Sequence, residues 1–361
     1  MKLLGIIKLI CYSMVLFLGI YVLLWLDGLN RQEKQFSLAF RKVAPPRAFD
    51  KRQNELVTKI LLVTYFRGGS TFLGSIFDEN DDVFYWFEPL HGLKLKPQFI
   101  GGELRREPHE ILKEEVDILA NIFTCRLDRL KPAILEDLFS AIYPLSRIMS
   151  PYRRCMLNNR IKDNFTANAT PTCLHLAAEP CRTSPIRVVK SIRFRLDLVP
   201  YLVRRIPDLK VVYYTRDPRG IMFSVDRLTP DDLPDDKLTR GVGVVCGEMY
   251  QDITWLDDVT RSNDVRPVLV SYERLATHPH RTAREIYRSL GLAVPDRVLD
   301  HLTRITRAAN ESSMQAGLET TRINSTKTAT RWRTDMSAVL LVAVLRNRKC
   351  VDVIAKLKYT L

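Results

Sequence analysis

Residues 59–77 read KILLVTYFRGGSTFLGSIF. The unbroken apolar run predicts a buried strand, Gly68 and Gly69 predict a tight turn, and the apolar spacing beyond them predicts an amphipathic helix. Such a strand–glycine–helix unit can hold an anion, because the backbone approaches a ligand closely and the first amides of the helix are free. The stretch therefore predicts a phosphate-type site. The alternative is an ordinary strand–turn–helix with a solvated Arg67.

The side chains of this turn favour an oxyanion but not a nucleotide triphosphatase. That class needs the loop G-x-x-x-x-G-K-[ST], whereas here no lysine follows Gly69 and the turn is too short. Ser70 and Thr71 supply hydroxyl donors, and Arg67 supplies a guanidinium fork that suits phosphate or sulfate oxygens.

A second segment repeats the pattern. Residues 209–227 read LKVVYYTRDPRGIMFSVDR, which predicts a strand that runs into a helix. Pro218 stands where a first-turn proline is tolerated, and Asp217 is expected to cap the helix. A second anion is expected at this helix start, although a capped helix with a surface pair of arginines would also fit the sequence.

The first segment resembles the 5′-phosphosulfate loop of sulfotransferases, which use 3′-phosphoadenosine 5′-phosphosulfate (PAPS) as sulfuryl donor. In that family a Lys or Arg leads a short Ser/Gly/Ser/Thr turn, and an aromatic residue follows. The matching positions are Arg67, Gly69, Ser70, Thr71 and Phe72. Gly68 departs from the family, which has Ser or Thr there, so one hydroxyl contact is missing while the backbone of the turn remains.

The resemblance extends to the second segment and to the C-terminus. Sulfotransferases bind the 3′-phosphate through an Arg at a strand end and a Ser eight residues later, the spacing of Arg216 and Ser224. Membrane-bound carbohydrate 6-O-sulfotransferases end on a Trp-Arg, a late Cys and a terminal Tyr, which the segment 330–361 resembles. This places Arg333, and with less support Arg331, near the donor. A solvated basic loop is the alternative.

The resemblance covers residues 57–361 and implies transfer of a sulfuryl group from PAPS to the 6-hydroxyl of galactose, N-acetylglucosamine or N-acetylgalactosamine. The acceptor would be a glycan or proteoglycan chain, such as a glycosaminoglycan. Two alternatives remain at this point. One is an inactive glycan-binding membrane protein of the same fold, and the other is a nucleotide-dependent kinase of a related fold, which would need the lysine that is absent here.

Glu88 is the expected general base. It follows the aromatic run of residues 83–87, and an apolar setting makes a carboxylate a better base near neutral pH. The resemblance also gives this role to a Phe-Glu-Pro segment. His91 is the competing candidate for the general base, because an imidazole titrates near neutral pH. The alternative for Glu88 is a carboxylate that only forms an ion pair and takes no part in catalysis.

Two basic residues lie toward the end of the strand expected near 187–193. Lys190 and Arg193 either face the donor or acceptor sulfate or are surface charges at a strand end. The chemistry demands no metal, and the chain has no C-x-x-C pair.

The N-terminus predicts a membrane anchor. No residue from Leu9 to Leu26 is charged, which is long enough to span a bilayer, and no A-x-A cleavage site follows. Lys2 and Lys8 predict a cytosolic N-terminus. We therefore expect a cytosolic tail at 1–8, a transmembrane signal anchor at 9–26, a stem at 27–56 and a luminal sulfotransferase domain at 57–361, as in a single-pass type II protein of the Golgi membrane.

Cysteines and sequons agree with a luminal domain. Six cysteines lie beyond the span, an even number compatible with disulfides: Cys125, Cys155, Cys173, Cys181, Cys246 and Cys350. Neighbour pairing within the Cys155–Cys181 group and a bond between Cys246 and Cys350 is one possible arrangement. N-glycosylation sequons stand at Asn164, Asn168, Asn310 and Asn324.

The net charge of +14 suits an anionic donor and a polyanionic glycan. Nucleic acid is the usual partner of a basic protein, but the anchor and the sequons argue against it. A homodimer is compatible with the sequence.

Because strands alternate with helices, an α/β fold is expected, with a P-loop-like parallel sheet covered on both faces. A further strand is expected at 267–273, and helices at 109–123, 130–149, 242–260, 279–290 and 296–308.

Overall fold

The computed structural model describes residues 57–93, 109–137, 145–162, 172–227, 235–262, 265–309 and 320–359. All of them belong to the compact unit Asp50–Leu361. None of the helices within these ranges is both long and apolar enough to cross a bilayer. The expected tail, signal anchor and stem lie outside the described residues and stay predictions.

Five parallel strands form the centre of the fold in the order β2-β3-β1-β4-β5. Their bounds are β1 Thr58–Val63, β2 Val83–Phe87, β3 Ile186–Ser191, β4 Leu209–Thr215 and β5 Val268–Ser271. The predicted α/β fold with a parallel sheet is thereby confirmed. All carboxyl ends meet at one edge, and β1 lies between β3 and β4, where the chain direction across the sheet reverses. Ligands bind beside such a switch point in open parallel sheets.

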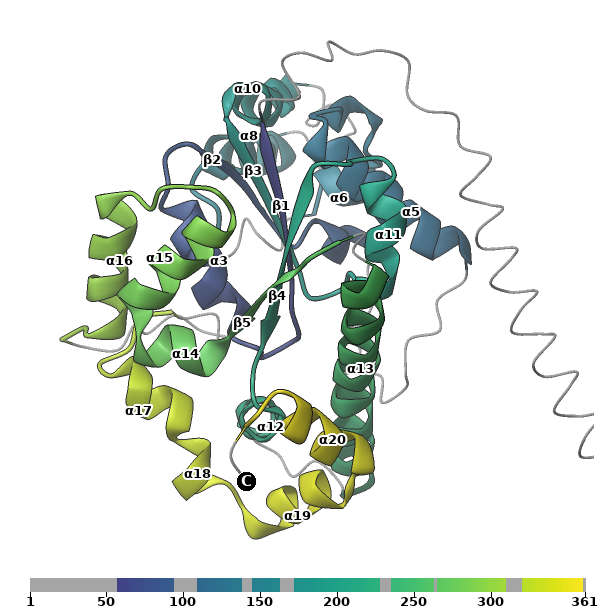
Figure 1. The fold of residues 1–361 in the computed structure, drawn as a ribbon. Coiled ribbons are helices and arrows are strands. Elements are labelled where there is room, and N and C mark those ends of the chain that lie inside the picture. The colour runs from purple at the N-terminus through teal and green to yellow at the C-terminus, as the bar shows by residue number, and fades with distance from the viewer. Residues whose placement is uncertain are drawn as a thin grey trace, which may run out of the picture. The chain divides into compact units, whose positions relative to one another are not determined.

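Helices cover both faces of the sheet, as Figure 1 shows. Ile60 and Leu62 of β1 belong to a core shared with α3, α14, α15 and α16, while Leu61 and Val63 are buried outside that cluster. The bounds of this layer are α3 Ser70–Asp78, α14 Tyr272–Thr277, α15 Pro279–Ser289 and α16 Asp296–Thr306. On the other side lie α5 His109–Phe123, α11 Val199–Val203 and α13 Asp235–Ser262, and η3 Leu196–Leu198 contacts α11 and α13.

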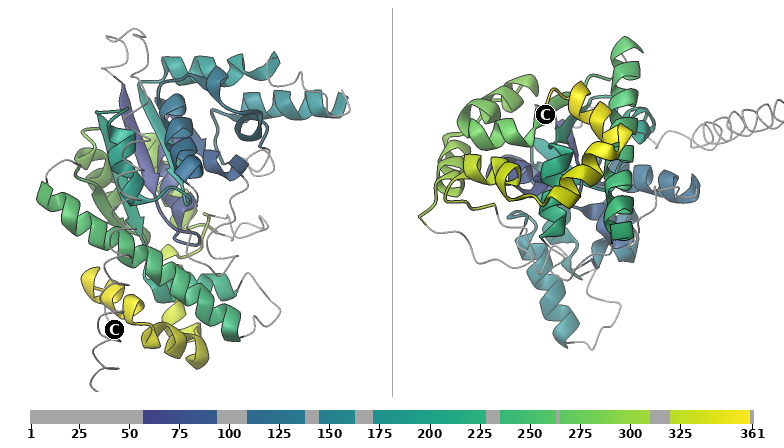
Figure 2. Two further views of the ribbon diagram at one scale, coloured as in Figure 1. Left: turned by 90° about the vertical axis from the view of Figure 1, so that its right-hand side faces the viewer. Right: turned by 90° about the horizontal axis from the view of Figure 1, so that it is seen from below.

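The C-terminal helices, yellow in Figure 1 and Figure 2, gather near the carboxyl end of the sheet, beside α12 as labelled in Figure 1. α12 spans Pro218–Asp226 and contacts α13, α18, α19 and α20. The remaining bounds are η1 Pro89–Leu93, η2 Leu127–Arg129, α6 Pro132–Leu135, α8 Ser150–Lys162, α10 His175–Thr183, α17 Ser325–Thr330, α18 Trp332–Asp335, α19 Ala338–Arg346 and α20 Arg348–Lys356.

Three disulfides use the six cysteines of the described residues, in the pairs Cys125–Cys181, Cys155–Cys173 and Cys246–Cys350. The bond between Cys246 and Cys350 is as expected, and so is the neighbour pair Cys155–Cys173. Cys181 pairs outside that group.

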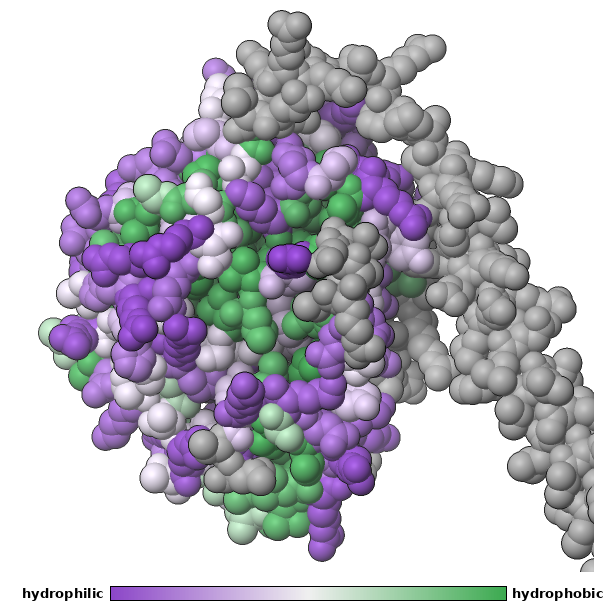
Figure 3. Space-filling view, in the orientation of Figure 1, coloured by the Kyte–Doolittle hydropathy of each residue, from purple (hydrophilic) through white to green (hydrophobic). Residues whose placement is uncertain are grey.

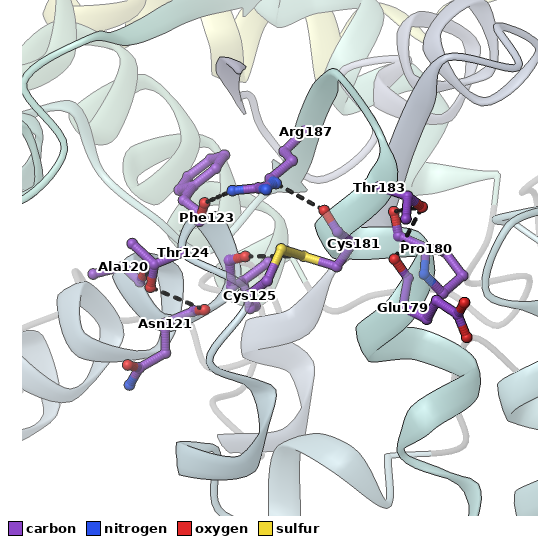
Figure 4. Close-up of a disulfide and its surroundings, with 11 residues drawn as sticks. Ala120, Asn121, Phe123, Thr124, Cys125, Glu179, Pro180, Cys181, Thr183 and Arg187 are labelled. Atoms are coloured by element: carbon purple, nitrogen blue, oxygen red, sulfur yellow. Dashed lines mark hydrogen bonds between the residues drawn. A yellow bond between two sulfur atoms is a disulfide. The ribbon is translucent and has the colours of Figure 1, made fainter. Parts of the chain in front are cut away.

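Figure 4 shows the bond of Cys181 to Cys125 beside Arg187 of β3. The guanidinium of Arg187 donates to the carbonyl oxygens of Cys181 and Phe123 at 2.9 and 2.8 Å. Burial lowers the pKa of Arg187 to about 10. Through these hydrogen bonds, Arg187 connects the two segments joined by the disulfide to β3.

Two expected elements differ from the structure. The strand at 267–273 ends at Ser271, because the Ser271 hydroxyl caps α14 by accepting a hydrogen bond from the Arg274 amide. The helix expected at 130–149 is not continuous: among the described residues of this range only α6 is helical, and residues 138–144 lie outside the described part of the chain. Ser146 instead bonds to the Tyr85 carbonyl, and the backbone of Arg147 bonds to Asp78.

The expected helices at 109–123, 279–290 and 296–308 correspond to α5, α15 and α16, and α13 is longer than the predicted 242–260. Of the sequons, Asn164, Asn168 and Asn310 lie outside the described residues. Asn324 is exposed at the start of α17, where its side chain accepts a hydrogen bond from the Lys327 amide.

Candidate active site

The glycine turn after β1 has a backbone that few side chains allow. Arg67 and Gly69 both adopt positive φ angles, 59° and 80°. A Cβ atom on Gly68 would lie 3.0 Å from the Thr64 hydroxyl, and one on Gly69 would lie 2.3 Å from Cδ2 of Tyr272. No side chain within the described part of the chain caps α3 at Gly69. The turn therefore leads the backbone directly into the first amides of α3, at Ser70 and Thr71.

The two predicted anion loops meet in space. Nε of Arg67 donates to the hydroxyl of Ser224 at 3.0 Å. Nη1 of Arg216 donates to the Arg67 carbonyl at 2.9 Å. Arg67 follows β1, Arg216 follows β4 and Ser224 lies on α12, so residues 149 and 157 positions apart share one site at the carboxyl edge of the sheet.

Tyr272 and Glu273 hold the two loops together, which agrees with the structural role that their resemblance to a strand end of the family suggests. The Tyr272 ring packs against Gly69, and the guanidinium carbon of Arg216 lies 4.4 Å from the ring centroid. The Glu273 carboxylate accepts a hydrogen bond from the Asp217 amide at 2.9 Å. Burial raises the pKa of Glu273.

Buried polar atoms around this turn suit an anion. Within the residues that the structure describes, the Thr64 hydroxyl and Nε of Arg216 are buried and have no hydrogen-bond partner. Such groups are costly to bury unless they are satisfied. A donor molecule with phosphate and sulfate oxygens would provide acceptors here. The residues present therefore fit the donor that the resemblance implies.

Glu88 lies in an ionic setting rather than the apolar one expected. The side chain is buried at the carboxyl end of β2, and its φ of 51° is in the left-handed region. One carboxylate oxygen lies 2.8 Å from Nζ of Lys190 and accepts from the Ile192 amide at 2.8 Å. The other accepts from Arg193 at 2.7 Å. Strained backbones concentrate at functional sites, which agrees with a role for Glu88. The role as base stays a prediction.

Lys190 and Arg193 are thus buried partners of Glu88 and not surface charges at a strand end. Burial lowers the pKa of Lys190, while the neighbouring Glu88 opposes that shift. The ammonium also lies 4.1 Å from the centroid of the Phe87 ring. The three charged groups form one unit at the ends of β2 and β3.

His91, the competing base, lies on η1 with Nδ1 2.9 Å from the carboxylate of Asp137. This contact orients the imidazole. Both His91 and Glu88 follow β2, so both remain near the carboxyl edge of the sheet.

The C-terminal arginines have different surroundings. Trp332 is buried, and the guanidinium carbons of Arg333 and Arg219 lie 4.6 and 4.5 Å from its ring centroid. A Cβ on Gly220 would approach the Trp332 ring at 3.1 Å, so α18 packs closely on α12. This brings Arg333 to the helix of Ser224. Arg331 instead makes an exposed pair with Asp335 at 2.6 Å.

No group of three or more metal-ligating His, Cys, Asp or Glu side chains occurs in the described ranges. The expectation of a metal-free reaction stays a prediction.

The fold is a parallel α/β sheet with two arginine-led strand–helix turns that meet at its carboxyl edge. The model of the Sulfotransferase family matches residues 60–296, and the chain belongs to this family of enzymes. Carbohydrate sulfotransferase 1 of Mus musculus is 29% identical over 334 residues, which cover 84% of this chain and 79% of that protein. Carbohydrate sulfotransferase 3 of Homo sapiens is 26% identical over 316 residues, covering 77% and 62%.

The fold has a counterpart among solved structures. The Sulfotransferase Domain from the Synechococcus PCC 7002 Olefin Synthase superposes with a TM-score of 0.50 at 14% identity, covering 89% of this chain and 99% of that domain. This likeness concerns the fold alone. The chain is accordingly a sulfotransferase similar to enzymes that act on carbohydrates.

Proposed function

We propose that this enzyme transfers a sulfuryl group from PAPS to the 6-hydroxyl of a galactose, N-acetylglucosamine or N-acetylgalactosamine residue in a glycan or proteoglycan chain. The observation that carries the proposal is the meeting of the two anion loops, in which Arg67 bonds to Ser224 and Arg216 bonds to the Arg67 carbonyl. Two adjacent oxyanion sites suit a donor with two separate phosphate groups.

In this proposal each loop holds one end of the donor. Arg67, the turn at Gly68 and Gly69, and the first residues of α3 (Ser70, Thr71 and Phe72) hold the 5′-phosphosulfate. Arg216 and Ser224 hold the 3′-phosphate, and Arg333 adds positive charge from α18. The buried Thr64 hydroxyl and Nε of Arg216, which lack partners among the described residues, support this assignment.

The donor supplies the sulfuryl group together with its phosphate leaving group. Arg67 and the loop amides stabilise the charge that develops on that phosphate. Glu88 accepts the proton of the sugar hydroxyl, whose oxygen forms the new bond to sulfur as the old sulfur–oxygen bond breaks. Lys190 and Arg193 hold the Glu88 carboxylate in place. Positioning and electrostatics supply most of the catalysis, as in phosphoryl transfer.

Donor binding tests the assignment. We expect the Arg67→Ala and Arg216→Ala variants to bind the product nucleotide 3′-phosphoadenosine 5′-phosphate (PAP) about 10-fold to 100-fold more weakly in calorimetry, since each removes charge-assisted hydrogen bonds. Arg304→Ala, an exposed arginine of α16, is the control and should bind normally. Normal binding by Arg216→Ala would contradict the assignment of the 3′-phosphate.

We also propose that the enzyme is a single-pass type II protein of the Golgi membrane. The uncharged run from Leu9 to Leu26, the four sequons and the three disulfides support a luminal catalytic domain. Protease protection in sealed microsomes should leave the catalytic domain intact. Full digestion before detergent is added would contradict this topology.

A further inference from the structure

A cationic pocket of about 550 Å³ lies apart from the loops described above, between α13 and the corner where α19 meets α20. Four of its seven lining residues are basic and none is acidic: Arg240, Arg346, Arg348 and Lys349. Gly243, Val244 and Asn347 complete the lining.

The arginine at the mouth of the pocket is only weakly neutralised. Arg348 pairs with Asp352 at 3.5 Å, but its side chain is 91% exposed, so the pair removes little of its charge. Arg348 therefore keeps most of its positive charge at this pocket.

The backbone that carries this pocket is fixed in advance of binding. Cys246 of α13 lies one turn beyond Gly243, and its disulfide joins Cys350, which directly follows Lys349. Both cysteines are fully buried. The Asn347 side chain accepts hydrogen bonds from the Lys349 and Cys350 amides and so fixes the corner. A preformed site loses less entropy when it binds a ligand.

The pocket lies toward the same end of the molecule as the donor loops. Its walls α13, α19 and α20 all contact α12, the helix that carries Ser224. Figure 1 shows α12, α19 and α20 beyond the carboxyl edge of the sheet, where they meet the lower end of α13. A polymer that presents one sugar to the donor site could therefore extend across α12 to the pocket.

A flat lipid surface fits this corner less well. Val339, Val342 and Leu345 of α19 are exposed, and Figure 3 shows an apolar patch at the lower end of the molecule, where Figure 1 places this helix. The four cations, however, gather around one pocket beside α13, and such a cluster suits a discrete anionic group better than the plane of a membrane.

We propose that this pocket binds a sulfate or carboxylate group of the acceptor glycan at a distance from the reacting sugar, so that the enzyme favours acceptors that already carry negative charge. The proposal rests on the proposed function, because that function supplies the glycan. It adds a second contact with the polymer, whose effect is a raised local concentration of the reacting sugar.

A matched pair of variants at Gly243 tests the proposal. A Cβ there would have Asn347 Nδ2 as its nearest neighbour at 3.8 Å, so both alanine and a longer side chain have room. Gly243→Glu adds a carboxylate to the pocket, while Gly243→Ala adds only a methyl group and favours the helix. The probe is a chondroitin sulfate hexasaccharide, titrated by calorimetry. We expect at least tenfold weaker binding for Gly243→Glu and unchanged binding for Gly243→Ala.

A charge-matched comparison guards against a general electrostatic effect. The triple variant R346Q/R348Q/K349Q should weaken hexasaccharide binding at least tenfold, and R284Q/R288Q/R304Q, which removes three exposed charges from α15 and α16, should change it less than twofold. The slope of affinity against salt should fall only for the first triple. Equal losses in both triples would overturn the proposal. The proposal would also be overturned if the pocket variants lost binding to phosphatidylserine vesicles but kept binding to the hexasaccharide.

PAP binding on the same samples separates the two levels of inference. If PAP binds normally and Gly243→Glu leaves hexasaccharide binding unchanged, the proposal about the pocket is overturned while the proposed function stands. Failure of the wild-type protein to bind PAP would instead overturn the proposed function.

Discussion

The Gly69→Ala variant tests how tightly the two anion loops are coupled. The added methyl group would lie 2.3 Å from Cδ2 and 2.7 Å from Cε2 of Tyr272, far inside the usual contact distance. Gly69 also has a φ of 80°, which is unfavourable for alanine. The ring cannot move freely, because Arg216 stacks on it and the Phe72 ring packs edge-on at 6.4 Å between centroids.

Two effects set the expected magnitude. A left-handed backbone costs an L-residue about 1–2 kcal/mol, and overpacking a buried contact costs about 1–3 kcal/mol. Together they predict a loss of about 2–5 kcal/mol in the free energy of unfolding, which a protein of ordinary stability survives. The clash can be relieved only if the glycine turn or the Tyr272 ring moves. The first movement displaces the 5′-phosphosulfate loop and the second displaces Arg216, so PAP affinity should fall at least tenfold.

Chemical denaturation and calorimetric titration with PAP measure the two effects. Gly243→Ala is the control, since the same change in an open helical position should be neutral or stabilising. The clash also predicts coupling: in a double-mutant cycle with Tyr272→Ala, Gly69→Ala should cost less once the ring is gone. A Gly69→Ala protein with wild-type stability and PAP affinity would refute the reasoning.

Three further predictions concern buried charge and cross-linking. Glu88→Gln leaves Lys190 without a buried counter-charge, which should destabilise the fold by about 3–5 kcal/mol in denaturation experiments. It should also abolish single-turnover transfer while PAP still binds; normal turnover would exclude Glu88 as the base. Burial, with a smaller contribution from the adjacent Glu79, raises the pKa of Asp78 to about 7. The native state then binds a proton more tightly than the unfolded chain, so stability should fall as pH rises from about 4 to about 7, and Asp78→Asn should flatten this slope; an unchanged slope would contradict it. Replacing Cys246 and Cys350 by serine opens a loop of 104 residues and should cost about 4–5 kcal/mol, against about 3 kcal/mol for the 18-residue loop of Cys155–Cys173; an equal or smaller loss would contradict the entropic argument.

The sequence predicts those parts of the site that depend on local pattern. An apolar run followed by glycines and a helix marks the turn at Arg67, and the strand–helix unit at Arg216 repeats it. Parallel strands bring their carboxyl ends to one edge, which is why residues of two distant segments meet. The contact of Arg67 with Ser224 follows from that topology.

The sequence does not predict contacts that depend on which strands are neighbours. Glu88 follows an aromatic run, but β3 lies beside β2 and places Lys190 and Arg193 against its carboxylate, 102 and 105 residues along the chain. The packing of the Tyr272 ring between Gly69 and Arg216 likewise depends on the strand order β1-β4-β5, because each of these residues follows one of these strands.

The break in the helix expected at 130–149 has a similar cause. Ser146 bonds to Tyr85 of β2 and Arg147 bonds to Asp78 at the end of α3, and these tertiary contacts outweigh the local apolar spacing.

Sulfate transfer by the purified catalytic domain tests the central claim most directly. Radiolabelled PAPS would be incubated with a panel of desulfated chondroitin, keratan-type and mucin-type glycans, and the labelled position read from the isolated sugars. The account predicts label on a sugar 6-hydroxyl of at least one glycan, and loss of that label in Arg67→Ala. The account would be contradicted if the protein bound no PAP, or if Arg67→Ala transferred as much label as the wild type.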